Sequence, residues 1–386
     1  QSADTTVSFA NTGTSNIVTI IRDNGSGSIT WPSSIKWNGG SAPTLNNGAV
    51  TNDFNVIKLL TRDEGVTWYG WEDASSAGGY HLWMFGENEY GVLGQNSQVD
   101  YSSPIQIPGM GWGQLATGVN GVKAESNFSV KDDGTMWAWG ENSWGTLGLN
   151  QASAQLNAAS SPTQLPGTTW NQFAIQRDMG TIATKTDGTL WVWGKNSAGT
   201  LGQSQAYAQL AAKSSPAQIG SGTDWKLTPS YGNITGSSYQ FAAIKTDGTL
   251  YTWGYNGFGA LGQSEGSNAH KSSPTQIPGT TWKSVSGGYY SMSAIKTDGT
   301  LWTWGNNPAG RLGHNNTDLY SSPKQVPGTT WKQVSMDANS TLAVKTDGTL
   351  WAWGDGGVQL GQNSPGTKFS SPVQIPGTSW NFVAAT

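Results

Sequence analysis

The sequence contains no cysteine, so neither a disulfide framework nor a thiolate metal site can form. Charged residues account for only 11% of the 386 residues, and the formal net charge is −4. Because binding phosphates requires clustered Lys and Arg, we expect no nucleic-acid partner. The purely apolar runs are far shorter than the roughly 20 residues of a membrane helix, so we expect no membrane span.

Glycine and aromatic residues, in contrast, are abundant. The chain has 53 Gly, 21 Trp, 12 Tyr and 9 Phe. This aromatic content excludes a disordered polypeptide, which is typically poor in aromatics and rich in charge. Many of the glycines and tryptophans recur at regular intervals, which indicates a repeat protein.

The repeat has two recurrent parts joined by a variable loop. The string KTDGTLWxWG occurs at 185–194, 296–305 and 345–354, with close copies at 131–140 and 245–254 and an eroded copy that ends at 86. Each copy continues as x-Asn-x-x-Gly-x-Leu-Gly, except the last, which is one residue short and lacks the Asn. After a loop of variable length comes Ser-Ser-Pro-x-Gln-Ile-Pro-Gly-Thr-Thr-Trp or a near variant. The closing glycines of the first part lie 49 to 60 residues apart, so the chain holds six units.

Each unit contains an Asp-Gly pair flanked by apolar residues, which is a strong signal for a tight β-hairpin. Glycine tolerates the positive φ that the turn requires, and Asp bonds its own backbone there. We therefore predict turns rather than metal sites, and no metal or other cofactor, at these pairs: Asp187-Gly188, Asp247-Gly248, Asp298-Gly299 and Asp347-Gly348.

The strand after each turn is apolar on both faces. In 189–193, Trp191 and Trp193 share one face, while Leu190 and Val192 share the other. A strand that is apolar on both faces belongs to a sheet covered on both sides. We assign a structural role in the core to the repeated tryptophans, namely Trp137, Trp139, Trp191, Trp193, Trp253, Trp302, Trp304, Trp351 and Trp353.

Small sheets stacked around a ring satisfy this pattern, and a periodic Gly and aromatic motif is typical of propellers. We predict an all-β protein, a β-propeller of six four-stranded blades, with a seventh if 31–72 supplies one. A solenoid is the competing architecture. The chain ends shortly after the last repeat's Trp380, with only the start of the next segment, which is what the first copy lacks. We expect the N- and C-terminal strands to close the ring over 66–386.

The hairpin and Gly-x-Leu-Gly motifs resemble the regulator of chromosome condensation (RCC-type) repeat family over roughly 66–386. The resemblance implies a propeller, usually of seven blades. Members of that family often carry Gly-His before the hairpin, where this chain has Gly288-Tyr289 or Asn339-Ser340. Exchange activity on a small GTPase belongs to only some members and is not carried over. Non-catalytic bacterial inhibitor propellers are a closer analogy.

Residues 1–65 do not carry the repeat. Short strands are predicted at 5–9, 16–21, 28–31, 35–37, 55–60 and 66–71, between Gly, Asn, Ser and Pro turns. The segment ITWPSSIKWNGGSAPTL followed by VIKLLTRDEGVTWYG is similar to a small β module of tailed-phage structural and fibre proteins. We expect 1–65 to act as an anchor, through homo-oligomer or particle assembly.

Catalysis has little support in the sequence. The three histidines, His81, His270 and His314, lie in different units at non-equivalent positions. They offer neither a metal pair at ligand spacing nor a triad, so we predict that the protein is not an enzyme.

Function is expected where the units differ, because the scaffold is what repeats. Two variable positions in x-Asn-x-x-Gly carry aromatic or charged residues, and equivalent positions recur on one rim of a ring. We predict a binding rim there, the alternative being local packing of each side chain on its own loop. The candidates are Tyr90, Trp144, Tyr255, Phe258, Glu87, Glu141 and Lys195.

Two functional hypotheses follow. The first is a non-enzymatic interaction or adhesion propeller displayed on an exterior surface, in the first place that of a virion, with a protein or surface glycan as partner. The alternative is a free secreted bacterial binder or inhibitor. Both place the protein outside the cell or on a virion surface.

Overall fold

The computed structural model describes residues 81–116, 126–227, 232–355, 360–361 and 366–383, together with the backbone of six short strands between Thr5 and Ala74. The chain forms two compact units. One is Gln1–Met84 with Pro104–Gly113, and the other is Phe85–Ser103 with Gln114–Thr386. Among the residues described, no helix has the length and apolar character needed to cross a membrane.

The N-terminal segment is built from strands, and all six predicted strands are present. They are β1 (Thr5–Thr6), β2 (Ile17–Asp23), β3 (Ile29–Thr30), β4 (Ile35–Trp37), β5 (Phe54–Thr61) and β6 (Trp68–Ala74). One four-stranded sheet has the order β2-β5-β6-β4, and β4 runs parallel to β6. This sheet therefore differs from a simple antiparallel meander, and β6 pairs inside it rather than with a repeat.

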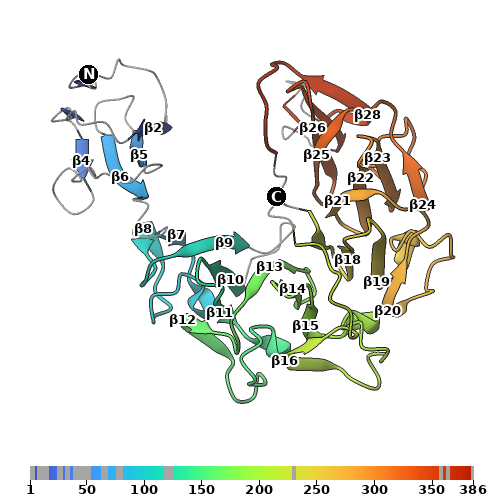
Figure 1. Cartoon of the computed structure of the whole chain (residues 1–386), viewed down its shortest axis with the longest axis horizontal. Helices are drawn as coiled ribbons and strands as arrows, with labels where there is room; N and C mark the ends of the chain where they lie inside the picture. The colour runs from blue at the N-terminus through green and yellow to red at the C-terminus, as the bar shows by residue number, and fades with distance from the viewer. Residues whose placement is uncertain are drawn as a thin grey trace. The chain divides into compact units, whose positions relative to one another are not determined.

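The repeats form antiparallel sheets, each with its strands in chain order, and the all-β propeller prediction is confirmed (Figure 1). The first repeat contributes the two-stranded sheet of β7 (Trp83–Gly86) and β8 (Tyr101–Gln106). Five four-stranded blades follow, and together with the N-terminal sheet the described residues hold six four-stranded sheets. Their strands are β9 (Trp112–Ala116), β10 (Ser126–Lys131), β11 (Met136–Glu141), β12 (Ala158–Gln164); β13 (Trp170–Ile175), β14 (Gly180–Lys185), β15 (Leu190–Lys195), β16 (Ala212–Gln218); β17 (Ile234–Gly236), β18 (Gln240–Ile244), β19 (Leu250–Gly254), β20 (Lys271–Gln276); β21 (Trp282–Gly287), β22 (Ser291–Lys296), β23 (Leu301–Gly305), β24 (Tyr320–Gln325); and β25 (Trp331–Met336), β26 (Ser340–Lys345), β27 (Leu350–Asp355), β28 (Lys368–Ile375).

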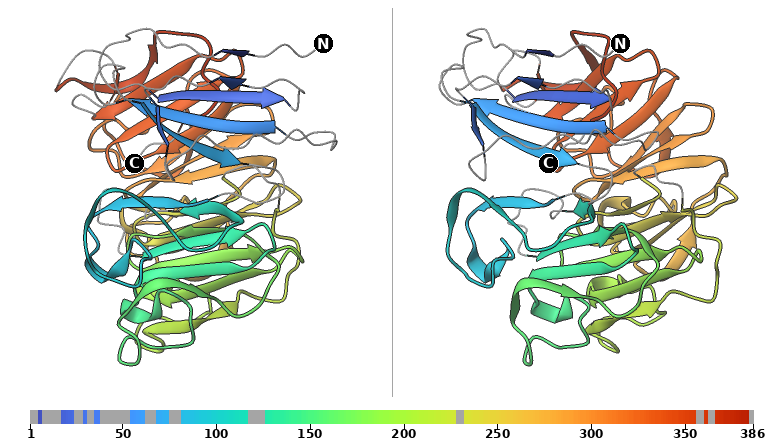
Figure 2. Two further views of the ribbon diagram at one scale, coloured as in Figure 1. Left: turned by 90° about the vertical axis from the view of Figure 1, so that its left-hand side faces the viewer. Right: turned by 60° about the vertical axis from the view of Figure 1, so that its left-hand side comes forward.

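Within the larger unit, the first strands of successive blades are neighbours. Strand β13 contacts β17, β17 contacts β21, and β21 contacts β25. The first strand of a blade is therefore the innermost, and the fourth is the outermost. Figure 2 shows these blades side by side from two further directions.

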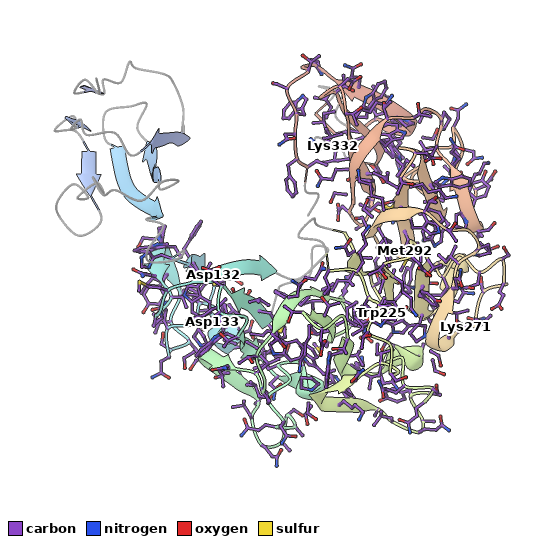
Figure 3. All side chains as sticks on the ribbon, in the orientation of Figure 1. Asp132, Asp133, Trp225, Lys271, Met292 and Lys332 are labelled. Carbon is purple, nitrogen blue, oxygen red and sulfur yellow. The ribbon has the colours of Figure 1, made fainter. Side chains whose placement is uncertain are left out.

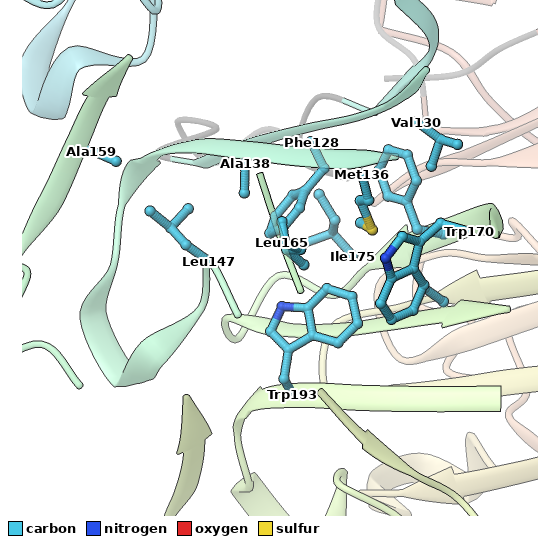
Figure 4. Packing of buried hydrophobic residues seen from close by; sticks show 12 residues of the cluster. Phe128, Val130, Met136, Ala138, Leu147, Ala159, Leu165, Trp170, Ile175 and Trp193 are labelled. Atoms are coloured by element: carbon cyan, nitrogen blue, oxygen red, sulfur yellow. The ribbon is translucent and has the colours of Figure 1, made fainter. Parts of the chain in front are cut away.

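A buried tryptophan spans the seam between one blade and the next. Trp193 of β15 is fully buried and packs with Phe128, Met136 and Trp170 of the seam before it, as Figure 4 shows. Its neighbours on the other strand face, Leu190 and Val192, pack instead in the next seam, around Trp253. Each blade thus contributes an indole to one side and aliphatic residues to the other.

The same indoles also donate hydrogen bonds across the seam. The Nε1 of Trp193 donates to the carbonyl of Thr146 at 2.8 Å, in the loop of the preceding repeat. The bond recurs in every described seam at 2.8–3.0 Å, from Trp139 to Val92, Trp253 to Thr200, Trp304 to Ala260 and Trp353 to Arg311. A buried indole N–H left without a partner would be costly, so each tether fixes where the next blade lies.

Two glycines of Gly-x-Leu-Gly make the close approach between blades possible. At Gly262 (φ +70°) an added Cβ would lie 2.8 Å from Nε1 of Trp304. At Gly259 (φ +69°) it would lie 2.6 Å from the Cα of Ser321, the first Ser of Ser-Ser-Pro in the next blade. The motif therefore repeats because a side chain at either position would collide with the neighbouring blade.

The Asn of the motif organises the loop between the third and fourth strands. Asn196 is fully buried, and its Oδ1 accepts a hydrogen bond from the backbone of Leu201 at 2.9 Å. Its Nδ2 donates to the carbonyls of Gln205 and Leu210. A single amide therefore holds both the short 3₁₀ turn and the longer loop beyond it. The 3₁₀ turns are η1 (Glu89–Gly91), η2 (Ser143–Gly145), η3 (Ser197–Gly199) and η4 (Gly257–Gly259).

The Asp-Gly pairs form the hairpin turns between the second and third strands. In each, the Asp carboxylate accepts hydrogen bonds from the backbone and hydroxyl of the Thr two residues on, as in Asp187 with Thr189 at 3.0 and 2.6 Å. These bonds lower the pKa of the Asp187 carboxyl. Gly188 has φ +80°, and the glycines 248, 299 and 348 have φ between +78° and +80°. The same Asp–Thr contacts occur at Asp247, Asp298 and Asp347.

Ring closure and the domain boundary at residues 65/66 stay predictions. At the C-terminal end, Val383 exchanges two hydrogen bonds with the side chain of Gln333 on β25. Residues 75–80 and 384–386, which the closing sheet would need, lie outside the described residues, as do 356–359 of the divergent last repeat.

The seam tryptophans should dominate stability. Replacing Trp193 with Ala should lower the free energy of unfolding by ~3–5 kcal/mol, through the loss of buried area and the cavity left behind. Trp193→Phe should cost less but still ~1–3 kcal/mol, because the Thr146 carbonyl loses its donor. Chemical denaturation would measure both. Trp144→Ala, at an indole that is 39% exposed, is the control and should be nearly neutral. Unchanged stability in both Trp193 variants would show the seam assignment to be wrong.

The seam glycines should not tolerate a methyl group. Gly262→Ala should destabilise the protein by ~2–4 kcal/mol, because it combines a positive φ with a collision against Trp304. Gly266→Ala, four residues along the same loop, is the matched control, because nothing lies within 4 Å of its added Cβ. Urea unfolding curves that shift equally for the two variants would contradict this account.

Candidate functional site

The blade topology divides the loops between two faces. In an antiparallel meander, the loop from the first to the second strand and the loop from the third to the fourth leave the sheet at the same end. We call that end of the blades the loop face. The Asp-Gly turns and the Pro-Gly segments leave at the other end, which we call the turn face.

Five aromatic side chains gather on the loop face of two adjacent blades. We call them the tyrosine patch, and they are Tyr239, Tyr255, Phe258, Tyr289 and Tyr290. Tyr239, Tyr289 and Tyr290 lie in loops between first and second strands. Tyr255 and Phe258 lie in the loop that follows β19.

Tyr290 is the centre of the patch. Its ring stacks on Tyr239 with centroids 5.6 Å apart and planes only 9° apart. Tyr255, Phe258 and Tyr289 surround it with ring centroids at 5.7, 5.5 and 4.5 Å. Burial raises the pKa of the Tyr290 hydroxyl, and the neighbouring tyrosines raise it further, so this hydroxyl stays uncharged up to alkaline pH.

The backbone under the patch is unusual for such large residues. Tyr290 has φ +54° and Phe258 has φ +59°. Bulky residues seldom adopt this left-handed conformation. Met179 (φ +65°) and Ala198 (φ +54°) share it at the equivalent positions of another blade, so the backbone belongs to the repeat and only the large side chains are particular to the patch. The side chain of Phe258 is nevertheless 42% exposed to solvent.

A buried arginine holds the loop that carries Tyr289 and Tyr290. Arg311 is almost fully buried, and its Nη1 donates to the carbonyl of Tyr289 at 3.1 Å and to the carbonyl of Ala338 in the next blade. Burial lowers the pKa of its guanidinium to about 10, which the nearby carboxylate of Asp337 partly opposes. Thr146, Thr200 and Ala260 occupy the equivalent position of other repeats. Arg311 is therefore a positioning residue particular to this blade.

One cation borders the patch. The guanidinium of Arg177 lies 5.1 Å from the ring centroid of Tyr289. Among the residues that the structure describes, no carboxylate forms an ion pair with it. An aromatic surface edged by an unpaired cation can bind an apolar side chain next to an anionic group.

The ring contacts of the described residues divide the predicted rim residues into two groups. Tyr255 and Phe258 join the patch. Trp144 lies with Tyr207 at a centroid distance of 6.5 Å, and Lys195 is 5.2 Å above its ring. Lys195 also pairs with Asp178 at 2.8 Å. The binding role of all of these stays a prediction, as does that of Glu141, which accepts a hydrogen bond from the Ser143 hydroxyl.

Two further candidates lie at the first repeat, where Glu87 precedes η1 and Tyr90 is inside it at φ +63°. The binding role predicted for both stays a prediction.

The sequence patterns did not identify four of these residues, namely Tyr239, Tyr289, Tyr290 and Arg311. The rule that led to Tyr255 and Phe258 compared positions inside Gly-x-Asn-x-x-Gly, and the three tyrosines precede the hairpin instead. A signal was nevertheless present, because Gly288-Tyr289 replaces the Gly-His expected from the family resemblance.

The three histidines are separate from one another and locally bonded. Nδ1 of His270 accepts the backbone N–H of Asn256 at 3.0 Å, and Nε2 of His314 lies 2.9 Å from the Thr303 hydroxyl. Nδ1 of His81 lies 2.6 Å from the side-chain nitrogen of Gln106. In the described part of the chain, no group of three or more His, Asp or Glu residues could hold a metal ion.

Comparison with known proteins identifies the repeat. Residues 247–295 and 298–344 match the family model "Regulator of chromosome condensation (RCC1) repeat". Human E3 ubiquitin-protein ligase HERC2 is 28% identical over 247 residues, which are 63% of this chain and 5% of that protein. The ultraviolet-B receptor UVR8 of Arabidopsis thaliana is 27% identical over 238 residues, 59% of this chain and 50% of UVR8. The chain thus spans half or less of the length of these curated relatives.

Solved structures share the fold. Prp20p of Saccharomyces cerevisiae superposes with a TM-score of 0.61 at 19% identity, covering 84% of this chain and 75% of Prp20p. Human WBSCR16 gives 0.60 at 17% identity, with 77% and 78% covered. RCC1 repeats are therefore matched within residues 247–344, and the chain shares the propeller fold of these structures. The resemblance of residues 1–65 to phage structural proteins stays a prediction.

His314 should make the protein less stable in weak acid. Burial, assisted by Lys324, lowers its pKa from 6.5 to about 4. The unfolded chain then binds a proton that the folded chain does not, so stability is lost as the pH falls from about 6.5 to 4. The expected loss is at most about 3 kcal/mol. Burial also lowers the pKa of His270, which acts in the same direction.

Denaturation midpoints between pH 4 and 7 would measure this loss. His314→Gln is the test variant, because Gln263 occupies the same place in the preceding repeat and donates to the hydroxyl of Thr252 at 3.0 Å. The variant should fold normally and show a shallower pH dependence. An unchanged pH profile would exclude His314 as a source of acid sensitivity.

Proposed function

We propose that the protein is a non-enzymatic interaction module that binds a protein partner on the loop face, through the tyrosine patch. The observation that carries the proposal is the patch itself. Five aromatic rings from two adjacent blades meet here, whereas the equivalent positions of the neighbouring blades hold Met179, Ala198 and Asn339. A repeat scaffold does not require these rings, because smaller residues fill the equivalent positions of other blades, so the gathering of five aromatics calls for a function.

The composition of the patch favours a protein over other ligands. Tyr and Arg are enriched among the residues that dominate protein–protein binding energy, and such anchors cluster inside a ring of weaker contacts. Tyr239, Tyr290 and Phe258 supply wide apolar area, while Arg177 supplies a cation at the edge. We infer that the partner presents an apolar side chain beside a carboxylate.

The relatives support a binding role. The structure of Prp20p was described together with its binding properties to Gsp1p and histones, and a second structure shows Kap60 bound to yeast RCC1. These partners belong to those proteins, and at this level of identity they do not transfer. What we extend to this chain is the use of a propeller as a protein-binding surface.

The location in which the protein acts is inferred from the sequence alone. The N-terminal segment supports display on a virion or other exterior surface, with residues 1–65 as anchor. A freely secreted binder is the alternative, and a surface glycan is the alternative ligand. Copurification with assembled particles would favour the first setting, and a protein found only in the free fraction would favour the second.

Site-specific photocrosslinking in producing cells would test the proposal. A benzophenone amino acid in place of Phe258 should give discrete protein adducts. In place of Thr280, an exposed residue on the turn face, it should not. Tyr290→Ser should remove the Phe258 adducts, because losing an aromatic anchor weakens binding by ~30-fold or more.

Three results would contradict the proposal. They are equal adducts from both positions, adducts that persist in Tyr290→Ser, and binding to a glycan array that Tyr290→Ser abolishes. The last would assign the patch to a carbohydrate instead.

A further inference from the structure

Three lysines occupy equivalent positions on three consecutive blades. Lys226, Lys283 and Lys332 each follow the tryptophan that ends the Pro-Gly motif. We call them the lysine arc. They lie on the turn face, away from the tyrosine patch. Lys283 and Lys332 are near the start of the innermost strands β21 and β25, and Lys226 lies at an isolated bridge ahead of β17. Figure 3 labels Lys332 and, on another blade, Trp225, the residue before Lys226.

Each lysine of the arc follows a tryptophan that is paired at the same level of its blade. The tryptophans before them pair with equivalent residues of the second strand, in the bridges Trp282↔Lys296, Trp331↔Lys345 and Trp225↔Lys245. Strand β21 contacts β25, and Nζ of Lys226 reaches the carbonyl of Lys283, so the arc runs across three neighbouring blades.

Backbone irregularities set the direction of two of these side chains. The register shifts between Trp282 and Ser284, and again between Trp331 and Gln333, so that Lys283 and Lys332 are the extra residues of β-bulges. A bulge bends the strand and redirects the side chain. The same bulge places Asn171 in another blade, so the repeat fixes the direction and the lysine is what distinguishes these blades. Both lysines are exposed.

The charges of the arc are not neutralised by the protein. Nζ of Lys226 donates to the carbonyl of Lys283 at 3.0 Å, and Nζ of Lys332 donates to the side-chain oxygen of Asn381. In the described ranges, none of the three forms an ion pair with a carboxylate. The nearest acid along the chain, Asp224, is paired with Lys245 at 3.0 Å.

The ammonium groups of Lys226 and Lys283 repel each other. Partial burial lowers the pKa of Lys226, and the positive charge of Lys283 lowers it further. Other lysines of the repeat differ, because they lie over indoles. Lys296, for example, is 4.7 Å from the ring centroid of Trp282 and 4.5 Å from that of Trp302. The arc thus concentrates positive charge in a chain whose net charge is negative.

We propose that the lysine arc is a binding site for a multivalent oxyanion, a phosphate or sulfate group held by two or three ammonium ions. Lysine binds phosphate as a mobile point charge, and hydrogen bonds between charged groups are about twice as strong as neutral ones. The anion would replace the missing carboxylates and relieve the repulsion along the arc. Free oligophosphate and sulfated saccharide share this chemistry.

Calorimetric titration of the full chain with inorganic tripolyphosphate would test the site. Lys283→Gln should weaken binding by about fivefold, and the triple change of Lys226, Lys283 and Lys332 to Gln should abolish it. Lys283→Arg, which keeps the charge, should retain binding. Lys368→Gln, which removes an exposed lysine near the C-terminus, is the matched control and should leave affinity unchanged.

Thermal melting of each variant without ligand shows whether the variant is folded. Removing like charges should leave the melting temperature unchanged or raise it. If the triple variant fails to fold, the affinities of the single variants Lys283→Gln and Lys332→Gln test the site instead. A parallel titration with a heparin-derived disaccharide distinguishes the two sources of the anion. Equal affinity of the triple variant and the unmodified protein would overturn the proposal. So would the absence of binding by either anion to the unmodified protein at physiological salt.

Discussion

The structure depends on an indole N–H that crosses from one blade to the next. A hydrophobic seam alone is non-directional and would allow neighbouring sheets to slide. The tether from Trp193 to the carbonyl of Thr146 adds direction, and it recurs at each described seam with nearly the same length. The glycine that closes Gly-x-Leu-Gly, just after each accepting carbonyl, leaves room for the ring. Tryptophan and glycine therefore recur together, since neither can change without the other.

This uniform scaffold separates stability from function. The turn residues and seam residues are nearly invariant between repeats, whereas the residues at the loop ends change freely. Both proposed sites arise from such changes. Tyr290 and Phe258 replace smaller residues of other blades on the loop face, and a lysine follows the motif tryptophan in three blades where others have Asn171, Gly113 or Asn381. A partner and an anion could therefore bind to opposite faces independently.

The regular part of the fold was predictable because its signals are local. Asp-Gly predicts a hairpin, and alternation along 189–193 predicts a strand covered on both sides, so the blades follow from short-range rules. The N-terminal strands were found in the same way. The buried role of Asn196 was not predicted, because its partners Gln205 and Leu210 lie in a loop of variable sequence. Of the five residues of the tyrosine patch, only Tyr255 and Phe258 were predicted. Tyr239 and Tyr255 become neighbours through the pairing of strands that no single motif contains.

Hydrogen exchange of the indole N–H groups, followed by NMR, tests the seam most directly. If the indoles of Trp139, Trp193, Trp253, Trp304 and Trp353 are bonded across the seams, their protons should exchange only when the protein unfolds globally. The exposed indoles of Trp144 and Trp380 should exchange at once. Rapid exchange at the five seam indoles in the folded protein would contradict the account.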